Sequence, residues 1–172
     1  MSGGYLLTLR ASWIPFAHRE AKGGKFFSAF EMEMCAAACE RVLPRDEEPG
    51  AIDLGVPQFI DSFLDRRRDW LDRIPGREAG TGHGFRQGLR ALNRWAFERE
   101  GRIFPQLSPE RQDAVLRSFE QEGGSSGQNF IRELTVLTLE GVMADPTYGG
   151  NKDRAGWRLI GFEVPCPNPS CE

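Results

Sequence analysis

The side chains that most often do chemistry in proteins are few in this 172-residue chain, which has two histidines and four cysteines. His18 and His83 lie in separate segments, and His83 stands in a glycine-rich run at residues 80–84. That run has neither the GxxxxGK[ST] nor the GxGxxG spacing of phosphate-binding loops, so we interpret it as a connection between helices. A histidine-centred acid–base site is therefore poorly supported.

The cysteines form two pairs with different expected chemistry. Cys35 and Cys39 are four residues apart in an expected helix, where they share a face and fit buried thiols. Cys166 and Cys171, in the run CPNPSC, could form a disulfide in an oxidising compartment. All four together could bind zinc, although CxxxC and CxxxxC are not the commonest zinc spacings. A Cys-based zinc-binding module is therefore one hypothesis for this chain.

Acidic pairs are the remaining candidates for acid–base chemistry, namely Glu133 with Glu140 and Asp145 with Asp153. Seven residues separate the two glutamates, which places them on one polar strip of an expected helix. No pattern gathers either pair into a pocket, and the HExxH metal motif does not occur. We therefore expect no catalytic, cofactor-binding or metal-binding residue, and a free-standing helical enzyme remains an alternative hypothesis.

Charge and hydropathy limit the kinds of partner. There are 22 basic and 25 acidic residues, and the longest basic run, at residues 66–68, lies between two aspartates. We interpret that run as a solvated helix face, and the lack of clustered positive charge argues against a nucleic-acid partner. Arginine outnumbers lysine 19 to 3, which either codon composition or a role of arginine in protein interfaces would explain. No stretch reaches the roughly 18 apolar residues of a transmembrane segment.

Five windows without glycine or proline predict five helices, at residues 26–43, 58–74, 89–100, 110–122 and 128–140. Each repeats apolar residues at three- and four-residue steps. In the first window the expected buried face consists of Phe27, Phe30, Met34, Ala38 and Val42. The last window is apolar nearly all round, so we expect it to be the central helix. Ser108, followed by Pro109 and Glu110, predicts a helix start capped by the serine hydroxyl.

These windows predict a mainly α fold, a small bundle of about five helices with an irregular C-terminal segment that could wrap a partner. We divide the chain into an N-terminal extension (1–27), a helical domain (28–145) and a C-terminal loop and tail (146–172). Residues 157–164 (WRLIGFEV) are the one strand-like run.

The most distinctive segment is the run DPTYGGN at residues 145–151. Pro146 ends the preceding helix, and the glycine pair permits backbone angles that other residues rarely adopt. Such a loop would hold Tyr148 and Asn151 in a defined pose. It can be interpreted as a well-formed helix stop or as a docking surface for another protein, because tyrosine and tryptophan anchor interfaces.

Together with GWRLIGF at residues 156–162, this run resembles the C-terminal signature of the gluconate 2-dehydrogenase subunit 3 family. Further similarity lies in residues 39–44 and 49–51, in GVPQFID at 55–61, and in Gly88-Leu89, Leu92-Asn93, Phe104, Leu107-Ser108 and residues 138–141. The resemblance covers roughly residues 28–164.

The resemblance implies a non-catalytic small subunit of a sugar or sugar-acid dehydrogenase complex. A large FAD-dependent flavoprotein of the glucose-methanol-choline type would oxidise the sugar, and a cytochrome c subunit could accept the electrons. FAD, and any iron–sulfur cluster or haem c, would belong to those partner subunits. The small subunit would stabilise the flavoprotein and assist its maturation or export. The expected partner interface consists of Asp145, Pro146, Tyr148, Gly149, Gly150, Asn151, Trp157, Ile160 and Phe162.

Location is an open expectation. The resemblance implies the periplasm, because members of the family often carry a twin-arginine export signal. Residues 1–27 contain no arginine pair and no long apolar core, so no export signal is visible there. A cytoplasmic complex and export by a signal on the partner therefore both remain compatible with the sequence.

Overall fold

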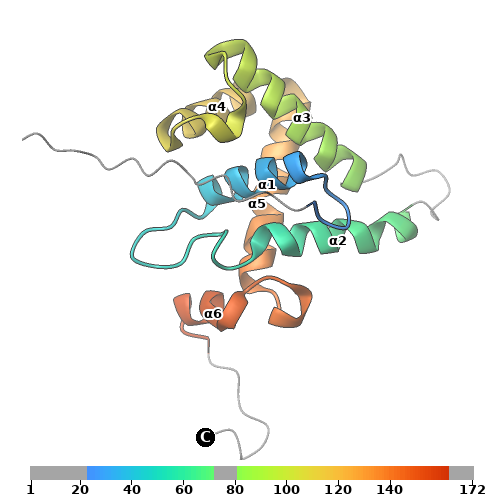
Figure 1. Ribbon diagram of the computed structural model, residues 1–172, viewed down its shortest axis with the longest axis vertical. Helices are drawn as coiled ribbons and strands as arrows, with labels where there is room; N and C mark the ends of the chain where they lie inside the picture. Colours follow the sequence, from blue (N-terminus) through green and yellow to red (C-terminus); the bar gives the residue numbers. More distant parts are fainter. Residues whose placement is uncertain (1–22, 72–80, 163–172) are drawn as a thin grey trace, which may run out of the picture.

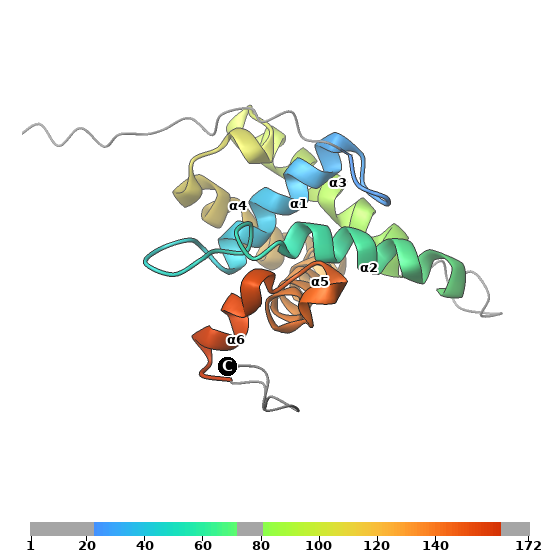
Figure 2. The same cartoon turned by 60° about the horizontal axis from the view of Figure 1, so that its bottom comes forward.

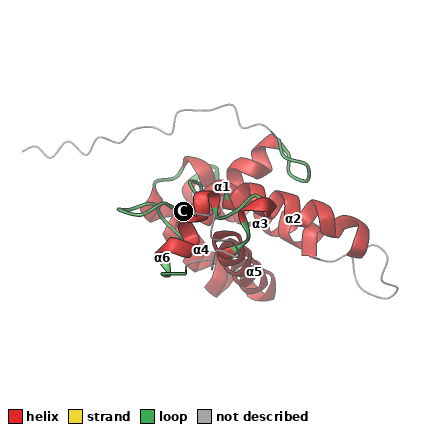
Figure 3. Ribbon diagram, turned by 90° about the horizontal axis from the view of Figure 1, so that it is seen from below, coloured by secondary structure: helices red, strands yellow, loops and turns green. Residues whose placement is uncertain are grey.

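The computed structural model describes residues 23–71 and 81–162, and this part of the chain is helical, with no strand (Figure 3). The predicted mainly α fold is thereby confirmed. The α-helices are α1 (Ala29–Val42), α2 (Val56–Leu71), α3 (Thr81–Glu100), α4 (Pro109–Glu122), α5 (Gly124–Met143) and the short α6 (Ala155–Leu159). Three 3-10 helices join them: η1 (Phe104–Gln106), η2 (Pro146–Tyr148) and η3 (Lys152–Arg154).

Helix α5 is central, as its apolar sequence predicted. It contacts α1, α2, α3, α4 and α6. Figure 1 shows it passing behind α1 and α2, with α3 and α4 toward one end and α6 at the other. Phe130, Leu134 and Leu137 bury one side of the helix in the core. The opposite side exposes apolar side chains, so α5 is not buried all round.

Helix α1 begins one residue after Ser28 because that residue forms a capping box with Glu31. The Ser28 hydroxyl accepts from the Glu31 amide, and the Glu31 carboxylate accepts from the Ser28 amide. The prediction of which side chains of this helix are buried was partly wrong. Phe27 reaches the core from the segment before the helix, and Phe30 is 42% exposed. Cys35 joins Met34 inside the core instead.

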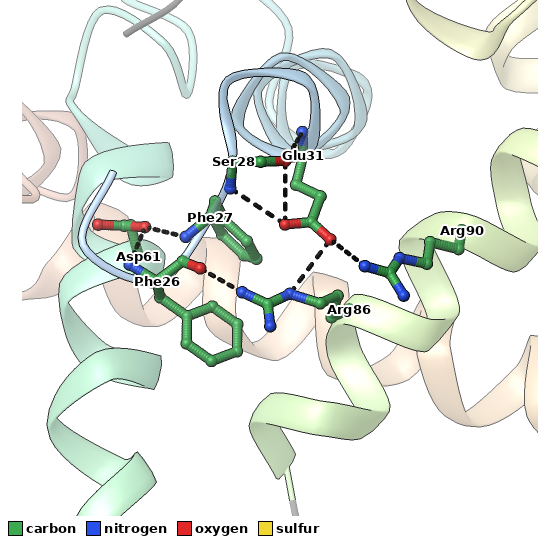
Figure 4. Close-up of polar contacts among 7 residues, drawn as sticks. All are labelled: Phe26, Phe27, Ser28, Glu31, Asp61, Arg86 and Arg90. Atoms are coloured by element: carbon green, nitrogen blue, oxygen red, sulfur yellow. Dashed lines mark hydrogen bonds and ion pairs between the residues drawn. The ribbon is translucent and has the colours of Figure 1, made fainter. Parts of the chain in front are cut away.

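Asp61 on α2 fixes the segment that precedes α1 (Figure 4). Its carboxylate accepts from three consecutive backbone amides, those of Lys25 at 2.7 Å, Phe26 at 3.0 Å and Phe27 at 2.8 Å. A Cβ at Gly24 would overlap this carboxylate, so the chain can wrap it only with glycine there. Both phenylalanines are buried. The packed part of the protein therefore begins before residue 28, the expected domain boundary.

Glu31 also joins α1 to α3. Its carboxylate pairs with Arg86 at 3.1 Å and with Arg90 at 3.1 Å, and Arg86 donates to the carbonyl of Phe26 (Figure 4). Burial would raise the pKa of Glu31, but the Ser28 amide and the Arg86 charge outweigh it and hold that pKa below its ordinary value.

Three local predictions were wrong. Helix α4 begins at Pro109 as expected, yet the Ser108 side chain caps no backbone amide. Residues 81–84 belong to α3 and are not a connection. The described part of the strand-like run, residues 157–162, forms the end of α6 and a turn, and Trp157 anchors it to the end of α5.

Candidate partner-docking surface

The run at residues 145–151 forms a tight reversal immediately after α5. Asp145 caps η2, and its carboxylate accepts from the Thr147 amide at 2.9 Å and from the Thr147 hydroxyl at 2.7 Å. These two bonds, the hydroxyl first, lower the pKa of Asp145. Gly149 ends η2 with φ +99°, an angle that favours glycine. The residue types therefore dictate the reversal locally, as the sequence indicated.

Asn151 fastens this reversal to the end of α5. Its side chain has no exposed surface, donating through Nδ2 to the carbonyl of Ala144 at 2.9 Å. Its Oδ1 accepts from the Gly156 amide at 2.8 Å. The backbone is left-handed there, at φ 47°, a conformation that asparagine tolerates better than most residues. One amide side chain thus joins α5, the reversal and α6.

Two glycines permit the close approach of these segments. A Cβ at Gly150 would overlap the carbonyl oxygen of Gly141 on α5. A Cβ at Gly156 would overlap the carbonyl oxygen of Val142. Gly149 is therefore needed for its backbone angle, whereas Gly150 is needed because it has no side chain.

The reversal also contacts the start of α2, more than 90 residues earlier in the chain. The Lys152 amide donates to the carbonyl of Leu54 at 3.1 Å, and Gly55 lies against the carbonyl of Gly149. Tyr148 lies under the guanidinium of Arg66, 5.4 Å from the ring centroid. Figure 2 shows this segment turning back beside α5 and α2.

Helix α6 is held by Trp157. Its indole Nε1 donates to the carbonyl of Met143 at 2.8 Å, which satisfies a carbonyl at the C-terminus of α5. The Trp157 and Phe162 rings meet edge to face, with centroids 5.6 Å apart. Trp157 is half-buried, whereas Phe162 remains exposed.

Exposed apolar side chains are concentrated at this end of the molecule. Of the nine large hydrophobic residues exposed in the described part of the chain, seven lie between residues 136 and 162. We call these seven the apolar docking surface: Val136, Leu139, Met143, Tyr148, Leu159, Ile160 and Phe162. The first three lie on the outer side of α5, since their spacing of three and four residues places them on one helix face.

The structure divides the expected interface residues into two groups. Tyr148 (53%), Ile160 (61%) and Phe162 (50%) are the apolar ones with exposed side chains. Asp145 and Gly149 are exposed as well, and Pro146 and Trp157 are half-buried. Gly150 and Asn151 are buried. Asn151 therefore offers no surface to a partner, and its expected contact role is replaced by an internal one.

Four members of the apolar docking surface were missed by the sequence reasoning: Val136, Leu139, Met143 and Leu159. The signal was present in the helix that is apolar nearly all round, because even the central helix of a small bundle has too few neighbours to cover every face. The capping box at Ser28 was also missed, although its spacing to Glu31 is the usual signature.

The cysteines of α1 are fully buried, and their Sγ atoms lie 3.9 Å apart. The hydrogen bond with Cys39 and burial raise the pKa of the Cys35 thiol well above its ordinary value, which makes it a poor nucleophile. The described residues contain no group of three or more side chains placed to hold a metal ion. Cys166 and Cys171 lie outside the described residues, so the disulfide and the zinc site stay predictions.

The two glutamates of α5 have different surroundings. Burial raises the pKa of Glu133 to about 7, and one of its oxygens is buried without a hydrogen-bond partner. Glu140 is exposed. Residues 123–127 (GGSSG) match the letters of the hydrolase pattern GxSxG, which places a serine between a strand and a helix. Here α4 precedes the run, so it lacks the context of a nucleophile elbow.

The fold and this surface define a small all-α protein whose exposed apolar side chains gather around the end of its central helix. The chain belongs to the gluconate 2-dehydrogenase subunit 3 family, whose sequence model matches residues 29–165. Neither a search of curated proteins nor a search of solved structures gave a match.

Membership implies an accessory subunit that forms a complex with other subunits of a dehydrogenase. Within residues 23–71 and 81–162, no helix has the length and apolar character needed to cross a membrane.

Proposed function

We propose that this chain is a non-catalytic small subunit of an FAD-dependent sugar or sugar-acid dehydrogenase complex. Its partner would be a large flavoprotein of the glucose-methanol-choline type, with a cytochrome c subunit as a further member of the complex. Family membership supports the accessory role. In this proposal FAD, and any iron–sulfur cluster or haem c, is bound by the partner subunits.

The observation that carries the proposal is the apolar docking surface. Soluble monomers rarely keep large contiguous apolar patches in water, and such patches commonly mark interfaces. Here the exposed apolar side chains follow one another along the outer side of α5 and through residues 148–162. Tyr148 supplies an aromatic anchor of the kind that contributes strongly to binding. Covering these side chains would remove apolar area from water on both partners.

Asn151 and the glycines support this surface from beneath. Because their bonds fix the path from α5 to α6, the exposed side chains are held in position before a partner binds. Preorganisation of this kind reduces the entropic cost of association. We infer that the subunit stabilises the flavoprotein and assists its maturation, and that the complex acts in the periplasm.

The test is co-expression of the flavoprotein with and without this chain, followed by measurement of its solubility, FAD content and dehydrogenase activity. We expect all three to fall when the small subunit is missing. The double variant I160S/F162S should reproduce that loss, because it makes the docking surface polar without touching Asn151. The matched control is F30S/F97S, which changes two exposed phenylalanines on α1 and α3.

Unchanged flavoprotein properties without the small subunit would refute the proposed function. Equal losses in the two double variants would refute the location of the interface. Cell fractionation of the complex tests the periplasmic location, and the visible absorption spectrum of the purified chain tests whether it binds a flavin or haem by itself.

A further inference from the structure

Four guanidinium groups in the described part of the chain lie over aromatic rings. Two of them also pair with a carboxylate of this chain. Arg86 is stacked 4.2 Å from a ring centroid and pairs with Glu31. Arg99 is stacked 3.5 Å from a ring centroid and pairs with Glu122 at 2.9 Å. In both cases the aromatic ring lies against the guanidinium, and a nitrogen of the same guanidinium pairs with the carboxylate. Arginine commonly combines these two interactions.

The other two, Arg66 and Arg67 on α2, also lie over a ring, but no carboxylate of the described residues pairs with them. Arg66 lies 5.4 Å from the centroid of Tyr148, and Arg67 lies 4.3 Å from that of Phe63. Both arginines are exposed, and neither forms an ion pair with a described carboxylate. The charge of Arg67 acts to lower the pKa of Glu133, although the two side chains form no ion pair. The solvated helix face expected for residues 66–68 is thus confirmed for these two positions, and the structure adds an aromatic ring beside each.

The rings place these arginines firmly. Phe63 is stacked on Phe59, with centroids 5.7 Å apart and planes 23° apart, and Phe59 is buried in the core. A stack therefore runs from the core through Phe63 to the guanidinium of Arg67. The backbone of Tyr148 is fixed in the reversal after α5, where its amide donates to the carbonyl of Asp145 at 2.9 Å, and its ring lies beside Arg66. Stacking restricts the side chains beforehand, so less rotamer entropy is lost when a carboxylate binds.

We propose that Arg66 and Arg67, with Phe63 and Tyr148, form an arginine–aromatic ledge that binds acidic side chains of the large dehydrogenase subunit. The inference rests on the proposed function and adds the chemistry of the partner's contact. Tyr148 belongs to both the ledge and the apolar docking surface, so the two are continuous. The partner should present aspartate or glutamate next to an apolar patch, because charge complementarity fixes the register of such interfaces.

The test uses the full chain and the flavoprotein with which it is co-expressed. The dissociation constant is measured for the wild type and for the double variant R66Q/R67Q, at about 50 and 300 mM salt, two concentrations at which screening differs strongly. The matched control is R94Q/R117Q, which removes the same charge from exposed arginines on α3 and α4. Thermal unfolding confirms that each variant is folded.

We expect R66Q/R67Q to bind at least about tenfold more weakly than the control and to lose much of the salt dependence. The variant R66K/R67K should also bind more weakly than the wild type, because lysine keeps the charge but not the planar fork. If the wild type binds and R66Q/R67Q matches the control, the ledge is wrong and the proposed function stands. If the wild type forms no complex, the proposed function is wrong, and the ledge with it.

Discussion

The buried side chain of Asn151 should be the most sensitive position in the segment that carries the docking surface. Asn151→Ala removes the donor to Ala144 and the acceptor for Gly156. Each lost bond costs about 1 kcal/mol net, and a buried amide left without an acceptor adds about 1–2 kcal/mol. Alanine also fits the left-handed backbone at φ 47° less well than asparagine, by about 1 kcal/mol. Together these contributions predict a loss of about 4–5 kcal/mol in the free energy of unfolding.

Two further variants separate these contributions. Asn151→Gly removes both hydrogen bonds but adopts the left-handed conformation freely, so it should be about 1 kcal/mol less destabilising than alanine. Asn151→Asp keeps the acceptor for Gly156 but turns a carboxylate oxygen toward the carbonyl of Ala144, and it should be at least as harmful as alanine at pH 7. The control, Asn129→Ala, removes an exposed asparagine of α5 and should change stability by less than about 0.5 kcal/mol.

Urea denaturation gives the free energy of unfolding, and hydrogen exchange of the Gly156 amide reports the bond itself. We expect this amide to exchange much faster in Asn151→Ala, while the amides of the α5 core keep their protection. The affinity of the Asn151→Ala variant for the flavoprotein should fall together with the protection of the Gly156 amide from hydrogen exchange. Unchanged protection of Gly156 in Asn151→Ala, with stability within about 0.5 kcal/mol of the wild type, would show that this residue does not fasten the segment.

Three other substitutions test separate parts of the fold by urea denaturation. Asp61→Asn should cost about 2 kcal/mol, because a neutral amide replaces a carboxylate that accepts from residues 25–27; full stability would contradict that role. Glu133 has a folded pKa of about 7 against an ordinary 4.5, so the folded state keeps a proton that the unfolded state releases between these values. Wild-type stability should fall by about 1–2 kcal/mol as pH rises through that window, after allowance for partial exposure, whereas Glu133→Gln should show no such fall. Arg154→Gly should stabilise the protein by about 0.5–1 kcal/mol, since φ is 57° there, whereas Arg117→Gly inside α4 should cost about 1 kcal/mol; equal effects would argue against backbone strain.

The positions of the helices were predicted from the stretches that lack glycine and proline, and the exceptions have a physical cause. The fifth helix was expected to begin after Gly127, yet α5 begins at Gly124. A Cβ at Gly127 would overlap the carbonyl oxygen of Phe119 on α4. This glycine therefore serves the close contact between two helices, which depends on both partners and is not visible in a local window.

The signature of the docking segment was recognisable from its letters, but the direction of each side chain was not. Tyr148 and Asn151 are both polar or amphipathic residues of one short loop, and both were expected at the interface. The structure turns Tyr148 outward and Asn151 inward, because the free carbonyl of Ala144 and the amide of Gly156 need partners.

By itself, the sequence determined the helical class, the five long helices, the reversal after α5 and the family. These depend on local propensity, apolar periodicity and residue order, which a linear reading contains. The tertiary structure alone decided which face of α5 stays exposed, which arginines stack without an acid, and that Asp61 fastens the segment before α1. Each of these depends on which groups from distant parts of the chain remain unpaired once the helices have packed.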